Sequence, residues 1–168
     1  MVELKKQDFE ENKKLYDNIK LELYKKISKS ISIDHVGSTA IPDMYGKNII
    51  DILIGVETKE EFNEFSNILV EMNYVPSQNS KTSIYQFFAS TKEETTSGDI
   101  HIHLVMKDTE RYKEFLILRD YLLNNKEEAK NYSDMKKEIL NNGFNDRKEY
   151  RHIKSKYVTE LIERAKKK

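Results

Sequence analysis

The 168-residue sequence contains no cysteine, which excludes disulfide bonds, thiolate catalysis and zinc held by cysteine. It also has no apolar run near the roughly 18 residues that a membrane-spanning helix needs. The first residues, MVELKKQDFEENKK, lack the apolar segment of a signal peptide. Together these absences predict a cytoplasmic protein without a membrane span.

An excess of charge of either sign is absent as well. The 29 basic and 29 acidic side chains give a formal net charge of zero. Because the molecule as a whole has no positive field, we expect neither polymer nucleic acid nor a membrane surface as a partner. The length fits a single domain, which typically has roughly 50–200 residues, and we expect one domain over residues 1–168.

Hydrophobic periodicity predicts an α+β fold, a mixed β-sheet flanked by helices with a helical C-terminal half. The strands at 83–90 and 100–106, joined by a polar link, predict a hairpin. The predicted helices are 8–28 and four more that begin near residues 58, 109, 125 and 146, and two further strands are 31–36 and 49–56.

The stretch 35–56 carries the first candidate site. A small-residue turn, Gly37-Ser38-Thr39, follows one strand, and such a turn lets backbone N–H groups approach an anion closely. Asp51 stands in the apolar run of the next strand, where a carboxylate is costly unless it is paired, hydrogen-bonded or metal-bound. The simpler interpretation is an ordinary turn whose backbone N–H groups donate hydrogen bonds to the Asp51 carboxylate.

Alternation along a later strand gives the second candidate. Asp99, His101 and His103 project to one side, because side chains on a strand alternate between faces. Two imidazoles at this spacing can share a metal ion, or one can act as a general base. A solvated or core histidine pair is the alternative. If this strand neighbours the strand that carries Asp51, one face of the sheet holds Asp51, His101 and His103 together.

The third candidate is a set of cationic side chains on the predicted helices. Arg147, Arg151 and Lys154 recur on one face of the last helix, and Arg119 lies on an earlier one. Such a row can bind phosphates, although rows of this kind are also common on solvated helix faces.

The motif at 35–42, followed by Lys47 and Asp51, resembles the signature of the GrpB family, formerly an uncharacterised protein family. That family is placed in the nucleotidyltransferase superfamily, with the polymerase-β-like fold. The resemblance continues at His101-Ile-His103-Leu-Val, Leu118-Arg-Asp-Tyr-Leu122, Tyr132-x-x-x-Lys136 and Asp146-Arg-x-x-Tyr150-x-x-x-Lys154.

The resemblance implies that a Gly-Ser turn holds the triphosphate of a nucleotide. It also implies an Asp-x-Asp pair and a third carboxylate that bind two Mg²⁺ ions. Gly37 and Ser38 match the turn, and Asp51 matches one acidic position. Ile49 and Leu53 stand where the second acid of the pair would be, so the pair is incomplete. Imidazoles on the later strand favour Mn²⁺ or Zn²⁺ over Mg²⁺.

The sequence therefore predicts a nucleotidyltransferase-fold protein that binds a nucleotide or another phosphorylated small molecule with a divalent metal, Mg²⁺ or Mn²⁺ by resemblance or Zn²⁺ through the histidines. Transfer of a nucleotidyl or phosphoryl group is the first reaction to consider. The alternatives are a catalytically inactive ligand-binding or regulatory module and a single-metal hydrolase. Phosphate binding is predicted for Gly37, Ser38, Thr39, Lys47, Arg119, Arg147 and Lys154, and catalysis and metal binding for Asp51, His101 and His103.

Overall fold

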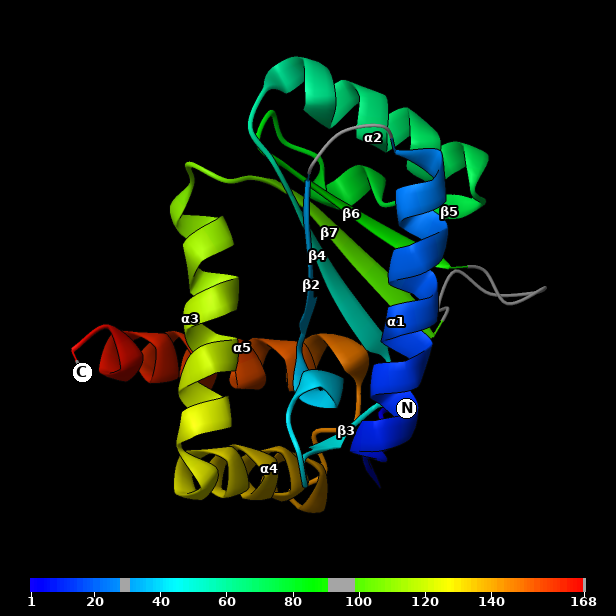
Figure 1. Ribbon diagram of the computed structural model, residues 1–168. Coiled ribbons are helices and arrows are strands. Elements are labelled where there is room, and N and C mark those ends of the chain that lie inside the picture. Colours follow the sequence, from blue (N-terminus) through cyan, green and yellow to red (C-terminus); the bar gives the residue numbers. More distant parts are fainter. Residues whose placement is uncertain (28–30, 91–98, 168) are drawn as a thin grey trace.

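The centre of the protein is a five-stranded sheet with the order β2-β4-β7-β6-β5, seen in a computed structural model that describes residues 1–27, 31–90 and 99–167 (Figure 1). The strands are β2 (Ser32–Val36), β4 (Ile50–Val56), β5 (Tyr74–Pro76), β6 (Tyr85–Ser90) and β7 (Ile100–Met106). β4 and β7 pair in parallel, whereas the other neighbours pair antiparallel. This arrangement confirms the predicted mixed sheet.

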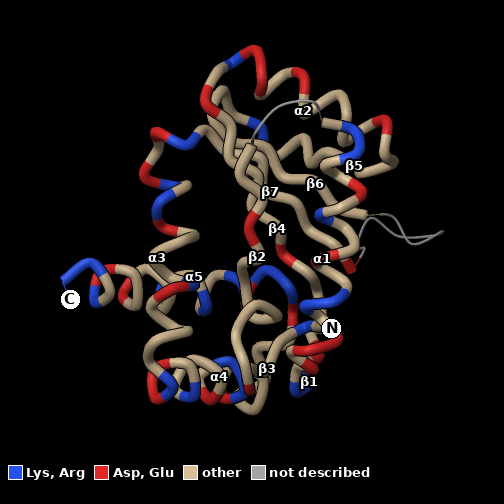
Figure 2. The backbone as a smooth tube through the Cα atoms, in the orientation of Figure 1, with Lys and Arg blue, Asp and Glu red and all other residues tan. Residues whose placement is uncertain are grey.

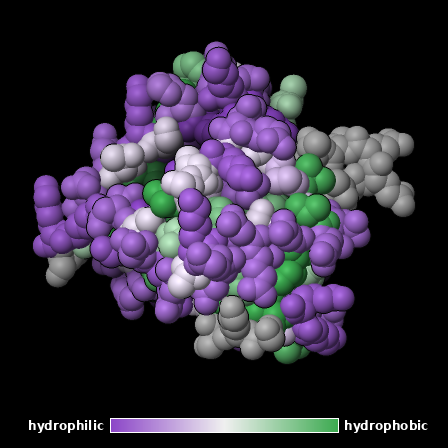
Figure 3. Space-filling model, turned by 90° about the horizontal axis from the view of Figure 1, so that it is seen from above, coloured by the Kyte–Doolittle hydropathy of each residue, from purple (hydrophilic) through white to green (hydrophobic). Residues whose placement is uncertain are grey.

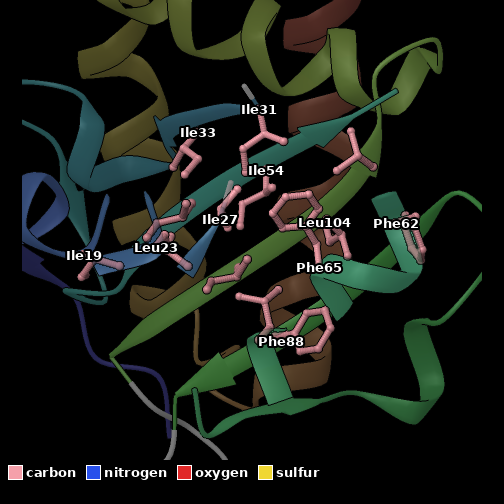
Figure 4. Close-up of a cluster of buried hydrophobic side chains, with 14 of the residues drawn as sticks. Ile19, Leu23, Ile27, Ile31, Ile33, Ile54, Phe62, Phe65, Phe88 and Leu104 are labelled. Atoms are coloured by element: carbon pink, nitrogen blue, oxygen red, sulfur yellow. The ribbon is translucent and has the colours of Figure 1, made fainter. Parts of the chain in front are cut away.

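Two helices cover one face of the sheet, α1 (Phe9–Lys26) and α2 (Lys59–Glu71) (Figure 1). Ile52 and Ile54 of β4 point to this face, because alternate residues of a strand share a face. Figure 4 shows the buried cluster in which apolar side chains of both helices meet those of the sheet. This burial of apolar surface is the main force that holds the two helices on the sheet.

The remaining helices are α3 (Glu110–Asn124), α4 (Lys126–Asn141) and α5 (Arg147–Lys166). α3 packs on the opposite face of the sheet, where its apolar side chains join Leu53 and Val105. α4 and α5 pack with α3 in a separate apolar cluster that also includes Ile41 and Met44. These contacts confirm the predicted helical C-terminal half and bring α4 beneath the segment that follows β2.

Local sequence signals account for the ends of several helices. Thr58 caps α2 in a capping box with Glu61, and Asp146 accepts backbone N–H groups at the start of α5. Asp8 is the N-cap of α1, so that helix begins at Phe9 and not at residue 8 as predicted. Gly143 follows the end of α4 with a positive φ of 85°, a conformation common just after a helix C-terminus.

Three short strands were not predicted from the sequence. β1 (Lys5–Lys6) pairs with β3 (Tyr45–Gly46), and β5 adds an edge to the main sheet. Their two or three residues are too few to show an alternating pattern. The hairpin of β6 and β7 is confirmed by their antiparallel register. Of its predicted polar link, residues 91–99, all but the last residue lie outside the described residues.

The face shown in Figure 3 is mainly hydrophilic, with smaller apolar areas between the charged side chains. Across residues 1–27, 31–90 and 99–167, no helix has both the length and the apolar character needed to cross a bilayer.

Candidate functional site

The site begins at the turn formed by Gly37, Ser38, Thr39 and Ala40, hereafter the 37–40 turn, which connects β2 to β3 and contains a short 3₁₀ helix, Ser38–Ala40. Gly37 has a φ of 74°, a conformation that side chains with a Cβ rarely adopt. A Cβ on Gly37 would fall 2.4 Å from Oδ2 of Asp51. Glycine is therefore required both by the backbone and by the close approach of the turn to the carboxylate.

The parallel pairing of β4 with β7 brings Asp51 beside the two histidines. Asp51 is in register with His101, and Leu53 with His103, so all three polar groups lie on the face covered by α3. Oδ1 of Asp51 is 3.4 Å from Nδ1 of His101 and 3.5 Å from Nε2 of His103. The structure thus brings together the three residues that were predicted for catalysis and metal binding.

The imidazoles determine the charge state of the carboxylate. Burial alone raises the pKa of Asp51, but hydrogen bonds from His101 and His103 outweigh burial and hold it well below its ordinary value. His103 is fixed from its other side, because Nδ1 lies 2.9 Å from the hydroxyl of Tyr85. Arg111 in turn stacks on the Tyr85 ring, 3.6 Å from its centre. Asp51 is therefore a carboxylate at neutral pH in an organised polar group.

The fit of these side chains to a metal ion can be tested from their arrangement. Among the described residues, no three His, Cys, Asp or Glu side chains are arranged to hold one. One nitrogen of each imidazole faces the same oxygen of Asp51, as in a hydrogen-bonded group. In this arrangement Asp51, His101 and His103 do not fit a three-ligand metal site, and metal binding stays a prediction.

A lysine that was not among the predicted site residues lies directly under the turn. The ammonium of Lys136, on α4, donates to Oγ of Ser38 at 2.9 Å and to the backbone carbonyl of Tyr45. It also lies 4.6 Å from the centre of the Tyr132 ring, and only 2% of the residue is exposed. Burial, together with the charge of Lys154, lowers the pKa of Lys136 to about 7, although Asp51 acts in the opposite direction.

A sequence signal for Lys136 exists in the helical spacing of α4. Lys136 occupies the apolar stripe of that helix, at a position where a cation is unexpected. The other members of this buried stripe are Ala129, Tyr132, Ser133 and Ile139.

Further cations lie close to Lys47, which follows the turn in the sequence. Burial lowers the pKa of Lys47, and the positive charges of Lys154, Arg147 and Arg151 lower it further, with Asp51 opposing them. Three of these cations come from α5, along which Lys and Arg recur (Figure 2). The predicted phosphate-binding residues Lys47, Arg147 and Lys154 are thus near enough to one another to interact electrostatically.

Two predicted phosphate ligands have other partners in the structure. Arg119 donates to Asp34 at 3.0 Å and to Asp120 at 2.8 Å, so its guanidinium is engaged by two carboxylates. Thr39 is only 1% exposed, and its hydroxyl donates to the backbone carbonyl of Ile49. A phosphate could accept from the Thr39 hydroxyl only if the bond to Ile49 broke, and two of the five N–H donors of Arg119 are already used. Together, the fold and the site define an α+β protein with a basic site built around a glycine-serine turn.

Comparison with known proteins assigns the chain to a family. The profile of the family described as GrpB protein matches residues 2–164. The glutamate-rich protein GrpB of Alkalihalophilus pseudofirmus is 31% identical over 153 residues, covering 89% of this chain and 88% of that protein. The UPF0157 protein BH1888 of Halalkalibacterium halodurans is 27% identical, covering 82% of this chain and 69% of that protein. The chain belongs to the GrpB family, which confirms the predicted resemblance.

Solved structures agree with this assignment. The crystal structure of the conserved protein GrpB from Enterococcus faecalis aligns with a TM-score of 0.82 at 19% identity, covering 97% of this chain and 96% of that chain. The two proteins therefore share a fold. A chain of the Cid1 poly(U) polymerase aligns with a TM-score of 0.49 at 17% identity, over 71% of this chain and 39% of that chain. An overlap at that level establishes no shared activity.

Proposed function

We propose that this GrpB-family protein binds the phosphate groups of a nucleotide or another phosphorylated small molecule at the 37–40 turn. The observation that carries the proposal is the buried ammonium of Lys136, which reaches Ser38 Oγ at 2.9 Å. Burial lowers its pKa first, the positive charges of Lys154, Lys137 and Lys47 lower it further, and Asp51 acts in the opposite direction.

Crowding of like charges in a partly buried site is unfavourable unless an anion binds among them. A phosphate group supplies both the negative charge and several acceptor oxygens, and hydrogen bonds between charged partners are about twice as strong as neutral ones. In this proposal Lys47, Lys136, Arg147 and Lys154 neutralise the phosphates, and backbone N–H groups of the small-residue turn bind them.

Transfer of a nucleotidyl or phosphoryl group to an acceptor hydroxyl is the reaction that this site would support. Asp51, His101 and His103 would supply the acid–base groups, since an imidazole beside a carboxylate is a common proton acceptor. A cytoplasmic setting, expected from the composition, belongs to the same proposal.

A second candidate, an inactive binding or regulatory module, is favoured by a specific position. Leu53 stands two residues after Asp51, where an Asp-x-Asp pair would have its second acid, and it is fully buried in an apolar cluster with Val36 and Val105. A carboxylate introduced there would be desolvated. The chain therefore has a packed hydrocarbon where two-metal chemistry needs an oxygen ligand.

A thermal-shift panel tests both candidates. Nucleotides, inorganic tripolyphosphate and phosphorylated sugars are added with EDTA, Mg²⁺, Mn²⁺ or Zn²⁺ to wild type, Lys136→Met and Asp51→Asn. A ligand at 100 times its Kd adds about 2.7 kcal/mol to stability, which is readily measured. The control is Lys156→Met, which makes the same substitution as Lys136→Met at an exposed lysine of α5.

We expect a phosphate-dependent shift in wild type and Lys156→Met that is strongly reduced in Lys136→Met. No shift with any phosphorylated compound would overturn the proposal. If a bound nucleotide is then consumed with an acceptor alcohol, the transferase is supported. Binding without turnover supports the inactive module, and metal-dependent hydrolysis without an acceptor supports a hydrolase.

A further inference from the structure

His35 belongs to the same motif as the 37–40 turn, yet it lies on the opposite face of the sheet from Asp51. In β2 it is in register with Ile52, whereas its neighbour Val36 is in register with Asp51. Its ring stacks on Tyr16 of α1, with centroids 4.6 Å apart and planes 10° from parallel. His35 therefore has no direct path to a ligand bound beside Asp51.

His35 reaches the turn through one hydrogen bond. Its Nε2 lies 3.0 Å from Oγ1 of Thr39, and the same hydroxyl donates to the backbone carbonyl of Ile49 at 3.1 Å. A hydroxyl has a single proton, and a carbonyl oxygen can only accept. Because the proton of Thr39 is used on Ile49, the bond from His35 requires a proton on Nε2.

This requirement determines the form of the ring. Burial lowers the pKa of His35 to about 4, so the imidazole is neutral at physiological pH. A neutral imidazole carries one ring proton, which the bond to Thr39 places on Nε2. The directed chain then runs from His35 to Thr39 and on to Ile49, two residues before Asp51.

The turn is consequently held at two points. On the α3 face, the backbone of Gly37 lies against Oδ2 of Asp51. On the α1 face, Thr39 ties the turn to the residue before β4, and His35 orients that hydroxyl. Loss of either His35 or Thr39 would release the turn on the α1 face without removing any group that touches a ligand.

We propose that His35 is a positioning residue which, through the Thr39 hydroxyl, fixes the 37–40 turn in the conformation that binds phosphate. The phosphate ligand in this inference rests on the proposed function, whereas the hydrogen bonds are those of the structure. It assigns the histidine of the motif to organisation of the site and excludes it from contact with the ligand.

The test compares tripolyphosphate binding, measured by titration calorimetry, among matched variants. His35→Phe keeps a flat ring on Tyr16 but has no donor, and Thr39→Val keeps the shape of threonine but has no hydroxyl. Thr39→Ser restores the hydroxyl. Ile54→Val removes one methyl group from the apolar cluster that contains Tyr16 and takes no part in the chain of bonds, so it reports the effect of lost stability alone.

We expect His35→Phe and Thr39→Val each to weaken tripolyphosphate binding about tenfold, whereas Thr39→Ser and Ile54→Val bind as wild type does. Because the two residues act through one chain, the double variant should lose no more than the larger single loss. Unchanged affinity in His35→Phe, or equal losses in Ile54→Val, would overturn the positioning role.

A second measurement does not depend on a ligand. Nitrogen-15 NMR of the imidazoles should show His35 as the neutral tautomer protonated at Nε2 between pH 5 and 8, and detection of the Nδ1–H tautomer would overturn the inference. If wild type binds no polyphosphate, the proposed function fails, and this tautomer still decides whether the hydrogen-bond chain exists.

Discussion

A Cβ placed on Gly37 would fall 2.4 Å from Oδ2 of Asp51, closer than any real side-chain contact allows. The turn and the carboxylate are therefore in direct contact, although the two residues lie on different segments of the chain. Any side chain at position 37 must displace Asp51 and, with it, the contacts that Asp51 makes with His101 and His103.

The first prediction follows from this contact. Gly37→Ala should lower the free energy of unfolding by about 1–3 kcal/mol, because the positive φ is strained for alanine and the carboxylate must move. Urea denaturation measures the loss. Gly143→Ala is the matched control, since its φ is also positive, at 85°, but a Cβ there meets nothing within 4 Å. Equal losses in the two variants would contradict a tight contact at Asp51.

The second prediction concerns pH and Lys136. Its pKa is lowered from 10.5 to about 7 by burial, so below pH 7 the lysine is charged in both states and the folded protein bears the full cost of burying it. Between pH 7 and pH 10.5, Lys136 is neutral in the folded state and still protonated in the unfolded state. The free energy of unfolding therefore rises with pH in this window, by at most about 1.4 kcal/mol per pH unit.

Comparison of wild type with Lys136→Met isolates this contribution, because the other titrating groups are common to both proteins. Urea denaturation from pH 6 to 10 should show the stability of wild type rising relative to the variant. A constant difference across that range would mean that Lys136 retains an ordinary pKa in the folded state.

The third prediction separates structure from binding at Arg119. Because its guanidinium is engaged by Asp34 and Asp120, Arg119→Met should lower stability by about 1–2 kcal/mol while leaving tripolyphosphate affinity almost unchanged. Asp120→Asn serves as the control, since the side chain of Asp120 is 56% exposed and its loss should matter little. A large loss of affinity in Arg119→Met would restore this arginine to the phosphate-binding set.

The fourth prediction concerns the cations of α5. Lys154 lowers the pKa of both Lys47 and Lys136, so Lys154→Met should raise both pKa values and weaken tripolyphosphate binding severalfold. The salt dependence of binding should also become shallower, because one phosphate contact is lost. Lys156→Met, on the same helix, should change neither property, and an equal effect of the two variants would indicate a diffuse field instead of a site.

Much of the site follows from short-range pattern. Alternation in β4 and β7 predicts that Asp51, His101 and His103 point away from the isoleucines beside them, and the structure places them so. Cap residues such as Thr58 also predict where helices begin, because the hydrogen bonds they make are local in sequence.

Other features depend on contacts between distant segments, which local pattern does not specify. The partner of Ser38 is Lys136, 98 positions later, and the partner of Arg119 is Asp34, 85 positions earlier. The sequence pattern of cations on a helix is the same whether they face solvent, a carboxylate or a ligand. Nothing local to Arg119 predicts that Asp34 engages its guanidinium. The spacing of α4 predicts that Lys136 is buried, but not that Ser38 is its partner.

The parallel pairing of β4 with β7 also has a consequence for the order of folding. Asp51 and His103 are 52 positions apart, and the chain between them forms α2, β5 and β6 before it returns beside β4. Closing a loop of this length costs more conformational entropy than forming the local contacts of a helix or hairpin. Since β7 is the last strand of the sheet along the chain, a chain still emerging from the ribosome contains the turn and its aspartate before the histidines, and the site can be completed only once β7 has joined β4.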